Sequence, residues 1–291
     1  MAHDIPKIVF NPIGGLANRM RVLASGISLA VELDCPYEIV WYRNWELNAR
    51  FEDIFKISPE IKDKIVYPDA IKYNLLYSVP RKRNLFVSDI LSRSYFGVTL
   101  RDCTKPLQDL ILYDKYDETK TLVRKSLEKG KNAFIQGGIQ FYPYTTQLYR
   151  HLFTPVDSIS KRVEELITRL GKDSIGIHIR RTDNTQSILH SPDFLFIREI
   201  NDALKRNPDV RFYLATDDEP TKLKFKELYG DRIIYSESEA DRNSITGIKD
   251  AATEMFVLSH TSRIIGSFYS SFSEAAATLG GKQLSQVCKK K

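Results

Sequence analysis

The second half of the chain alternates short apolar runs with longer amphipathic segments. The runs predict strands, and the segments between and after them have helical periodicity. Strands are predicted at residues 174–180, 210–215, 232–235 and 263–266. The last helix is predicted to start near Ser271 and to end at Gly280 and Gly281, since glycine readily ends a helix. This regular alternation predicts a parallel sheet covered by helices.

The first half is less regular. A strand is predicted at Ile8–Phe10 and a turn at residues 11–15, and an apolar stripe at helical spacing then predicts a helix with Leu16, Met20, Leu23, Ile27 and Ala30 on one face. Further strands are predicted at residues 38–41 and 133–136, but the elements of residues 43–130 cannot be traced from their weak periodicity. We therefore expect an α/β fold of two facing domains, residues 1–155 and 156–291.

The composition is that of a soluble globular protein. The 291 residues are 42% hydrophobic and 27% charged, enough for two cores of ordinary size. The net charge of +6 favours acidic ligands, but because it is spread along the chain we expect no nucleic acid partner. Three distant cysteines without zinc-like spacing indicate a reducing compartment.

Targeting signals are not evident in the sequence. The N-terminus lacks the pattern of a signal peptide, and no stretch approaches the ~20 apolar residues that cross a bilayer. The tail Cys288–Lys291 lacks the aliphatic positions of a prenylation signal. We expect a cytoplasmic protein with at most peripheral membrane association. The pattern predicts no oligomeric state.

The run from Ser174 to Asp183 carries the most informative chemistry, with the sequence SIGIHIRRTD. In a strand its isoleucines lie on one face, and His178 and Arg180 lie on the other. Arg180 and Arg181 bring planar donor groups that suit a phosphate, and together they carry more charge than a core strand easily tolerates. An edge strand with solvated arginines is the alternative for this run alone.

A serine cluster follows another predicted strand of the same sheet. Ligands of open parallel sheets bind at the carboxyl ends of the strands, so we expect the cluster to lie beside Arg180. It comprises Ser267, Ser270, Ser271 and Ser273. Unpaired amides at the start of the following helix attract an anion, and hydroxyls add hydrogen bonds. A plain helix cap is the alternative.

Two adjacent carboxylates follow a third strand, in Thr216-Asp217-Asp218. Glu219-Pro220 begins the next helix, so a helix cap is favoured over a metal site, and a ribose contact is a third interpretation. In the first domain, Gly14–Arg19 reads GGLANR, which is neither the dinucleotide fingerprint nor a P-loop. Its glycines permit close approach of a ligand, and Asn18 and Arg19 would reach into a cleft between the domains.

In their order along the chain, these motifs resemble the fucosyltransferase superfamily that joins α-1,2-, α-1,6- and protein O-fucosyltransferases. HIRRTD at His178–Asp183 and ATDD at Ala215–Asp218 are most similar to the α-1,6 branch. GGLAN at Gly14–Asn18 is closer to the other branches, and SFYSSFS at Ser267–Ser273 completes the set. The resemblance is good over residues 174–281, moderate over the first 30 residues and absent over residues 43–130.

The resemblance implies a GT-B-like fold of two facing Rossmann-like domains, with a GDP-sugar in the cleft held mostly by the second. It implies an inverting transfer without a metal. Arg180 matches the arginine that neutralises the departing β-phosphate, and His178 and Ser270 match donor-binding positions. Glu254 lies near the aspartate that reads guanine in the family, with Asp250 and a solvated glutamate as alternatives. Further donor contacts are expected from Gly15, Asn18, Asp217 and Ser271.

The resemblance does not identify the general base. The α-1,6 enzymes continue Thr-Asp with a lysine and then a glutamate, whereas this chain has Asn184 and, at residues 186–188, Gln, Ser and Ile. Asp183, His190 and Asp193 are candidates through their proximity in sequence. We expect Asp183 to be the catalytic carboxylate beside Arg180.

Together these observations predict a cytoplasmic glycosyltransferase of polysaccharide biosynthesis, which moves L-fucose from GDP-fucose to a glycan acceptor and needs no cofactor. One alternative is transfer of another nucleotide-activated sugar, because a phosphate clamp does not read the sugar. Another is a non-catalytic module that binds phosphoglycans or nucleic acid, suggested by the net charge and by Arg81-Lys82-Arg83.

Overall fold

The computed structural model describes residues 5–79, 87–112, 114–182, 185–237 and 244–289. The chain forms two compact units, Met1–Phe51 with Ile57–Phe153, and Glu52–Lys56 with Thr154–Lys291. The short segment Glu52–Lys56 joins the second unit through backbone hydrogen bonds from Lys56 to Thr154 and from Val156 to Ile54. Nothing in the sequence pattern predicts that this segment belongs to the second unit. The predicted fold class, two Rossmann-like α/β units, is confirmed.

The described residues of the first unit form a five-stranded parallel sheet in the order β3-β2-β1-β5-β4. The strands are β1 (Ile8–Pro12), β2 (Tyr37–Val40), β3 (Ile65–Val66), β4 (Phe96–Arg101) and β5 (Asn132–Gly137). The strands expected near residues 8, 38 and 133 are thus confirmed. The sequence pattern did not predict β3 and β4, which lie within residues 43–130.

Helix α1 (Leu16–Glu32) carries the predicted apolar stripe, and all five of its residues are buried. It packs closely on β1, because a Cβ at Gly26 would lie 2.6 Å from the ring of Phe10. The other helices of this unit are α2 (Ala70–Lys72), which continues as a π-helical turn (Tyr73–Tyr77), α3 (Val87–Tyr95), α4 (Lys105–Leu112), α5 (Tyr116–Glu128) and α6 (Thr146–Leu152). A 3₁₀ turn, Phe51–Asp53, begins at the last residue of the first stretch of this unit and leads into the segment Glu52–Lys56 of the second unit.

The second unit also holds a five-stranded parallel sheet in its described residues, in the order β10-β9-β6-β7-β8. The strands are β6 (Ile175–Ile179), β7 (Phe212–Thr216), β8 (Ile233–Ile234), β9 (Arg263–Ser267) and β10 (Leu284–Val287). The four predicted strands are confirmed, with boundaries shifted by one or two residues, and β10 was not predicted. Because β6 lies in the middle of the sheet, the interpretation of residues 174–180 as an edge strand is wrong.

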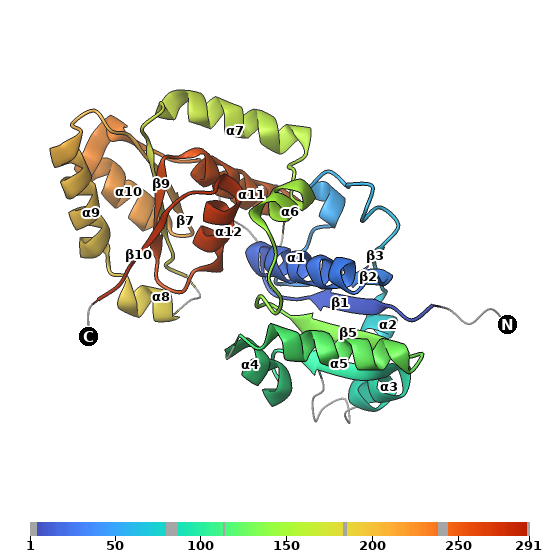
Figure 1. The fold of residues 1–291 in the computed structure, drawn as a ribbon. Helices are drawn as coiled ribbons and strands as arrows, with labels where there is room; N and C mark the ends of the chain where they lie inside the picture. Colours follow the sequence, from blue (N-terminus) through green and yellow to red (C-terminus); the bar gives the residue numbers. More distant parts are fainter. Residues whose placement is uncertain (1–4, 80–86, 113, 183–184, 238–243, 290–291) are drawn as a thin grey trace. The chain divides into compact units, whose positions relative to one another are not determined.

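Helices cover both faces of this second sheet (Figure 1). They are α7 (Asp157–Leu170), α8 (Thr185–His190), α9 (Asp193–Arg206), α10 (Glu219–Tyr229), α11 (Ile245–His260) and α12 (Ser271–Gly280), with a 3₁₀ turn at Gly230–Arg232. The isoleucines of β6 pack with residues of α9 and α10 in one core. On the other face, Gly176 faces α11, where a Cβ would lie 2.8 Å from Leu258. The predicted end of α12 is confirmed, since Gly281 caps it in the left-handed conformation.

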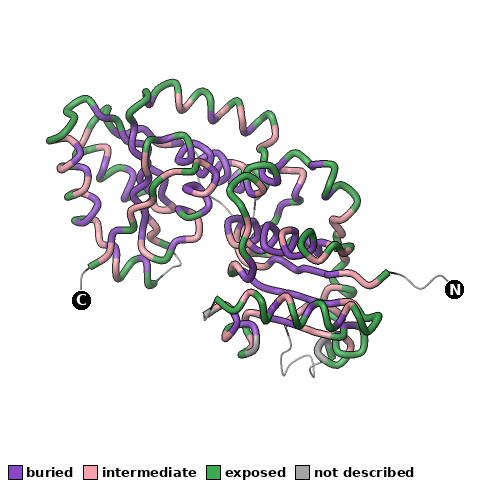
Figure 2. The backbone as a smooth tube through the Cα atoms, in the orientation of Figure 1, coloured by how far each residue is buried: buried purple, intermediate pink, exposed green. Residues whose placement is uncertain are grey.

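The central strands of both sheets are buried, while the outer faces of the helices are exposed (Figure 2). Every residue of β1, β6 and β7 is buried, as expected for parallel strands covered on both sides. Among the helices that the structure describes, none combines the length and the apolar character needed to cross a bilayer.

Candidate active site

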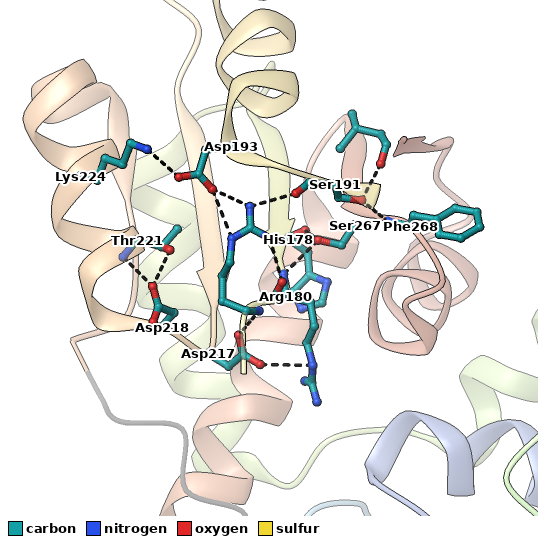
Figure 3. A network of polar contacts seen from close by, with 12 residues as sticks. His178, Arg180, Ser191, Asp193, Asp217, Asp218, Thr221, Lys224, Ser267 and Phe268 are labelled. Atoms are coloured by element: carbon teal, nitrogen blue, oxygen red, sulfur yellow. Dashed lines mark hydrogen bonds and ion pairs between the residues drawn. The ribbon is translucent and has the colours of Figure 1, made fainter. Parts of the chain in front are cut away.

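The carboxyl ends of β9, β6 and β7 lie side by side and bring the predicted polar residues together (Figure 3). His178 pairs in register with Gly266 on one side and with Ala215 on the other. Arg180, the first residue after β6, therefore lies between Ser267 and Asp217. The expected adjacency of these strand ends is confirmed.

Arg180 is held at both its backbone and its side chain. Its N–H donates to Ser267 Oγ at 3.0 Å, and its Nε lies 3.2 Å from Asp217 Oδ2. The side chain keeps 18% of its surface exposed. Because its neighbours already fix the chain, the guanidinium can meet a ligand without a large loss of conformational entropy.

Asp217 organises the loop that follows β6. Besides its ion pair with Arg180, its carboxylate accepts hydrogen bonds from Arg181 N at 2.7 Å and from Thr182 Oγ1 at 2.6 Å. Its negative charge offsets part of the charge of Arg180, so attraction of an anion to this edge also depends on the dipole of α12. The expected donor contact of Asp217 stays a prediction.

Arg181 does not lie at the same point as Arg180, and the expectation of two arginines at one anion site is wrong. Its guanidinium binds Asp193 at 2.5 Å, the carbonyl oxygen of Ser191 at 3.0 Å and that of Arg180 at 2.8 Å. It also lies 5.9 Å from the ring centre of Phe196. Arg181 is therefore a structural residue that joins β6 to the start of α9.

His178 is a buried, neutral partner of the serine cluster. Its Nδ1 lies 2.8 Å from Ser273 Oγ and 3.3 Å from Ser270 Oγ. Its ring stacks on Phe272 with 4.7 Å between ring centres. Burial, and secondarily the charge of Arg180, lower the pKa of His178 to about 3. The imidazole therefore orients the two serine hydroxyls without adding charge to the site.

The start of α12 has an unusual cap. Ser270 occupies the N-cap position, but its hydroxyl accepts no hydrogen bond from the first turn and bonds His178 instead. The interpretation of Ser270 as a side-chain helix cap is therefore wrong. The helix spans ten residues, so its dipole and first amides are suited to an anion. The phosphate-binding roles of Ser270 and Ser271 remain predictions.

Asp218, in contrast, is a plain cap. Its Oδ2 accepts hydrogen bonds from Thr221 N at 2.9 Å and from Thr221 Oγ1 at 2.6 Å (Figure 3). The predicted cap is confirmed. No cluster of three His, Cys, Asp or Glu side chains suited to a metal occurs in the described part of the chain.

Glu254 is a buried carboxyl group on α11. It is 7% exposed, so the alternative of a solvated helix glutamate is wrong. Burial raises its pKa to about 8, against the lowering influence of Lys222. Within the described residues its carboxyl group has no hydrogen bond or ion pair. Asp250, the competing candidate, is already ion-paired with Arg162.

Two hydroxyls of β7, the strand that runs beneath α11, share this lack of a partner. Tyr213 Oη and Thr216 Oγ1 are buried and have no hydrogen bond to any described residue. The negative charge of Glu254, after burial, contributes to raising the pKa of Tyr213. The two side chains point to opposite faces of the sheet, because side chains alternate along a strand. Only Tyr213 therefore shares the α11 face with Glu254. Buried polar groups are rarely unpaired in native proteins, so its hydroxyl has hydrogen-bonding capacity left for a ligand.

The Gly14–Arg19 motif lies in the first unit, between β1 and α1. Gly14 has φ +84°, which glycine tolerates and other residues rarely adopt, and its N–H donates to Glu46 Oε2 at 3.1 Å. A Cβ at Gly15 would meet nothing within 4 Å, so the backbone there is open to a ligand. Asn18 Oδ1 accepts a hydrogen bond from Arg21. The predicted donor contacts of Gly15 and Asn18 are not tested by these observations.

Arg19 does not reach outward, and that expectation is wrong. It is 1% exposed, and its guanidinium donates to Gly14 O, Tyr42 O and Asn44 Oδ1 at 2.7–2.9 Å. Burial lowers its pKa to about 10. Arg19 therefore fastens the glycine turn to the loop after β2.

The structure describes two of the three candidates for the general base, His190 and Asp193. Asp183 and Asn184 lie outside the described residues. His190 ends α8, where its ring packs edge-on to Phe268. Burial would raise the pKa of Asp193, but hydrogen bonds from Lys224 and Arg181 outweigh it and lower that pKa. Asp193 is thus a poor proton acceptor.

Solved structures of fucosyltransferases share this fold. NodZ α-1,6-fucosyltransferase co-crystallised with GDP, a protein also solved from Bradyrhizobium, is 18% identical with a TM-score of 0.61, covering 93% of this chain and 91% of that one. A mutant of Arabidopsis thaliana FUT1 in complex with GDP is 15% identical with a TM-score of 0.63, over 97% of this chain and 70% of that one.

POFUT1 in complex with GDP-fucose is 13% identical with a TM-score of 0.58, over 97% of both chains. No family model and no curated protein matches the sequence. At these identities the likeness concerns the fold. The chain thus has the GT-B-like architecture of two Rossmann-like units that these fucosyltransferases share.

Proposed function

We propose that this protein is a glycosyltransferase that moves L-fucose from GDP-fucose to a hydroxyl group of a glycan acceptor, with inversion and without a metal. The observation that carries the proposal is the position of Arg180 between Ser267 and Asp217, at a strand end shared with the start of α12. Structures with the same fold contain GDP or GDP-fucose. The four sequence motifs support the same superfamily.

The proposed reaction is a single displacement. The acceptor oxygen attacks the anomeric carbon from the side opposite the diphosphate and forms the new C–O bond. The bond between that carbon and the β-phosphate oxygen breaks, and GDP leaves with the electron pair. Arg180 and the first amides of α12 stabilise the charge that develops on the leaving diphosphate. Asp183 would accept the proton of the acceptor hydroxyl.

Glu254 is the proposed reader of guanine. A carboxylate accepts two hydrogen bonds from the N1–H and N2–H edge of that base. The carboxyl group is buried and unpartnered among the described residues, whereas Asp250 is engaged by Arg162. With a pKa of about 8 it is mostly protonated at pH 7. We therefore expect guanine binding to release a proton.

The remaining roles follow the motifs. His178, Ser270 and Ser271 would contact the donor phosphates, with Asp217 near the ribose. Gly15 and Asn18 of the first unit would contribute to the donor site, and residues 1–155 would hold the acceptor. We propose a cytoplasmic location, at most peripheral membrane contact and no nucleic acid partner.

The test begins with a thermal-shift panel of GDP, UDP, CDP and their sugar conjugates, followed by incubation with GDP-fucose and an oligosaccharide array. We expect selective stabilisation by guanine nucleotides and fucosylated products detected by mass spectrometry. Selective stabilisation by another nucleotide would favour transfer of a different sugar. Binding to nucleic acid that weakens steeply with salt, without turnover, would favour the non-catalytic module.

A further inference from the structure

Tyr269 is a bulky aromatic residue in the left-handed region of backbone conformation. Its φ is +58°, where Cβ crowds the backbone of every residue except glycine. Its side chain does not fill the core, because the residue is 69% exposed. Its ring contacts that of Phe268, with 6.0 Å between the ring centres, and most of the residue's surface stays open to solvent. Strain of this kind is concentrated at functional sites.

The backbone just before Tyr269 is clamped to α8 and its C-terminal end. Phe268 N donates to Ser191 Oγ at 2.8 Å, and Ser187 Oγ donates to Phe268 O at 2.7 Å. Ser191 Oγ in turn donates to Val287 O at 2.6 Å, and both serines are fully buried. Two sequence-distant serines thus fix the position from which the ring of Tyr269 projects.

The backbone just after Tyr269 is fixed as well. Ser270 begins α12, and its hydroxyl lies 3.3 Å from His178 Nδ1. Ser267, two residues before Tyr269, receives the N–H of Arg180. The ring is therefore carried by a rigid loop between the two groups to which the proposed function assigns the diphosphate.

We propose that the ring of Tyr269 is a stacking platform for a pyranose ring of the substrate. This inference rests on the proposed function, since the sugar is bonded to the phosphate next to the start of α12. C–H groups of a pyranose pack well on the electron-rich face of an aromatic ring. The pyranose is either the fucose of the donor or the acceptor sugar, because the two meet at the anomeric carbon.

Three substitutions separate the ring from the backbone. Tyr269→Phe keeps the ring, whereas Tyr269→Asn and Tyr269→Gly remove it but readily accept the left-handed conformation. We expect the Phe variant to bind and transfer like the wild type. The Asn and Gly variants should lose about two- to tenfold in affinity for the stacked sugar. Their thermal midpoints should stay at or above that of the wild type.

Two arms identify the source of the sugar. In the first, calorimetry measures the affinity for GDP-fucose relative to GDP, and a lowered ratio in the Asn and Gly variants assigns the platform to the donor. In the second, saturation-transfer NMR measures binding of the array oligosaccharides to the protein–GDP complex, and weaker binding assigns it to the acceptor. Tyr95→Asn is the matched control, since Tyr95 is 58% exposed on α3 of the other unit.

The possible failures are distinct. If the wild type does not bind GDP, the proposed function fails. If the wild type binds GDP and the Asn and Gly variants match it in both arms, only the role of Tyr269 is overturned. An arm in which no oligosaccharide binds to any of these proteins counts as a match. A Phe variant as impaired as the Asn variant would also overturn the platform, because it would assign the effect to the hydroxyl group.

Discussion

The backbone N–H of Arg180 donates a 3.0 Å hydrogen bond to Oγ of Ser267, a residue 87 positions later in the chain. The same hydroxyl lies 3.4 Å from the carbonyl oxygen of His178. One buried serine thus satisfies the backbone on both sides of Ile179 and sets the point at which the chain leaves β6. The direction of the Arg180 side chain depends on this bond.

Replacement of that serine tests the relationship directly. Ser267→Ala leaves the N–H of Arg180 without its partner in a buried environment, which costs about 1–3 kcal/mol. We expect a lower thermal midpoint and weaker GDP binding, measured by differential scanning calorimetry and by titration. Ser267→Thr keeps the hydroxyl and serves as the control. Unchanged GDP affinity in the Ala variant would show that this hydrogen bond does not contribute to GDP binding.

The two adjacent arginines should behave differently. Arg180→Ala removes a group proposed to act on the leaving diphosphate, so we expect kcat to fall a hundredfold or more, about 2.7–4 kcal/mol. Single-turnover transfer from GDP-fucose measures the effect. Near-normal transfer by this variant would contradict the assigned role.

Arg181→Met serves as the comparison. It leaves the carboxylate of Asp193 with Lys224 alone and removes hydrogen bonds to Ser191 O and Arg180 O. Breaking a largely buried pair costs about 3–5 kcal/mol, and Asp193 is 25% exposed, so the lower end is expected. Urea denaturation should show the loss. If Arg181→Met instead lowered kcat alone, Arg181 would belong to the site.

Glu254 should give the ligand-free protein a stability that decreases with pH. Its folded pKa of about 8 lies above the ordinary value of 4.5, so its contribution is fully present below pH 4.5 and is lost as pH rises through 8. Glu254→Gln should remove this decline, as measured by urea denaturation between pH 5 and 9. A parallel pH dependence in the two proteins would contradict the assignment.

Proton release on guanine binding gives a second, independent measurement of Glu254. At pH 7 the binding enthalpy of GDP should vary with the ionisation enthalpy of the buffer, because a mostly protonated carboxyl group becomes ionised against N1–H and N2–H. The Glu254→Gln variant should bind GDP more weakly and show no such variation. Equal proton release by both proteins would point to another group.

His178 should act in the opposite pH direction. Its folded pKa of about 3 lies below the ordinary 6.5, so the unfolded chain takes up a proton first and stability is lost as pH falls from 6.5 toward 3. His178→Gln should flatten this acid limb in thermal melts. The transfer activity of the wild type should also show no change near pH 6.5 that is missing from the Gln variant. Such a change would mean that the imidazole titrates in the working enzyme.

Much of the second unit was predictable from local patterns. The alternation of Ile175, Ile177 and Ile179 has the period of a strand, and this period depends only on backbone geometry. The rule that ligand groups gather at the carboxyl ends of parallel strands then brings Arg180 near the serines. Both steps use information within a few residues, and the structure confirms both.

The orientation of the charged side chains was not predictable in the same way. Arg180 and Arg181 are adjacent, yet one pairs with Asp217 and the other with Asp193. Arg19 was expected to reach outward, but it is buried, and its guanidinium donates to carbonyl oxygens of its own turn and of the loop after β2. In each case the group that pairs with the guanidinium is brought to it by the fold, and nothing in the residues next to the arginine identifies that group.

The sequence by itself determined four of the strands of the second unit, the start of the first unit and the residue types that meet at one sheet edge, because these follow from short-range periodicity and from helix signals. Tertiary structure alone decided that β6 is central and that Glu254 is buried. It also decided that His178 is neutral and that Tyr269 is held on a clamped loop. These properties depend on desolvation and on hydrogen bonds between residues far apart in the chain, which form only when the sheet and its covering helices pack.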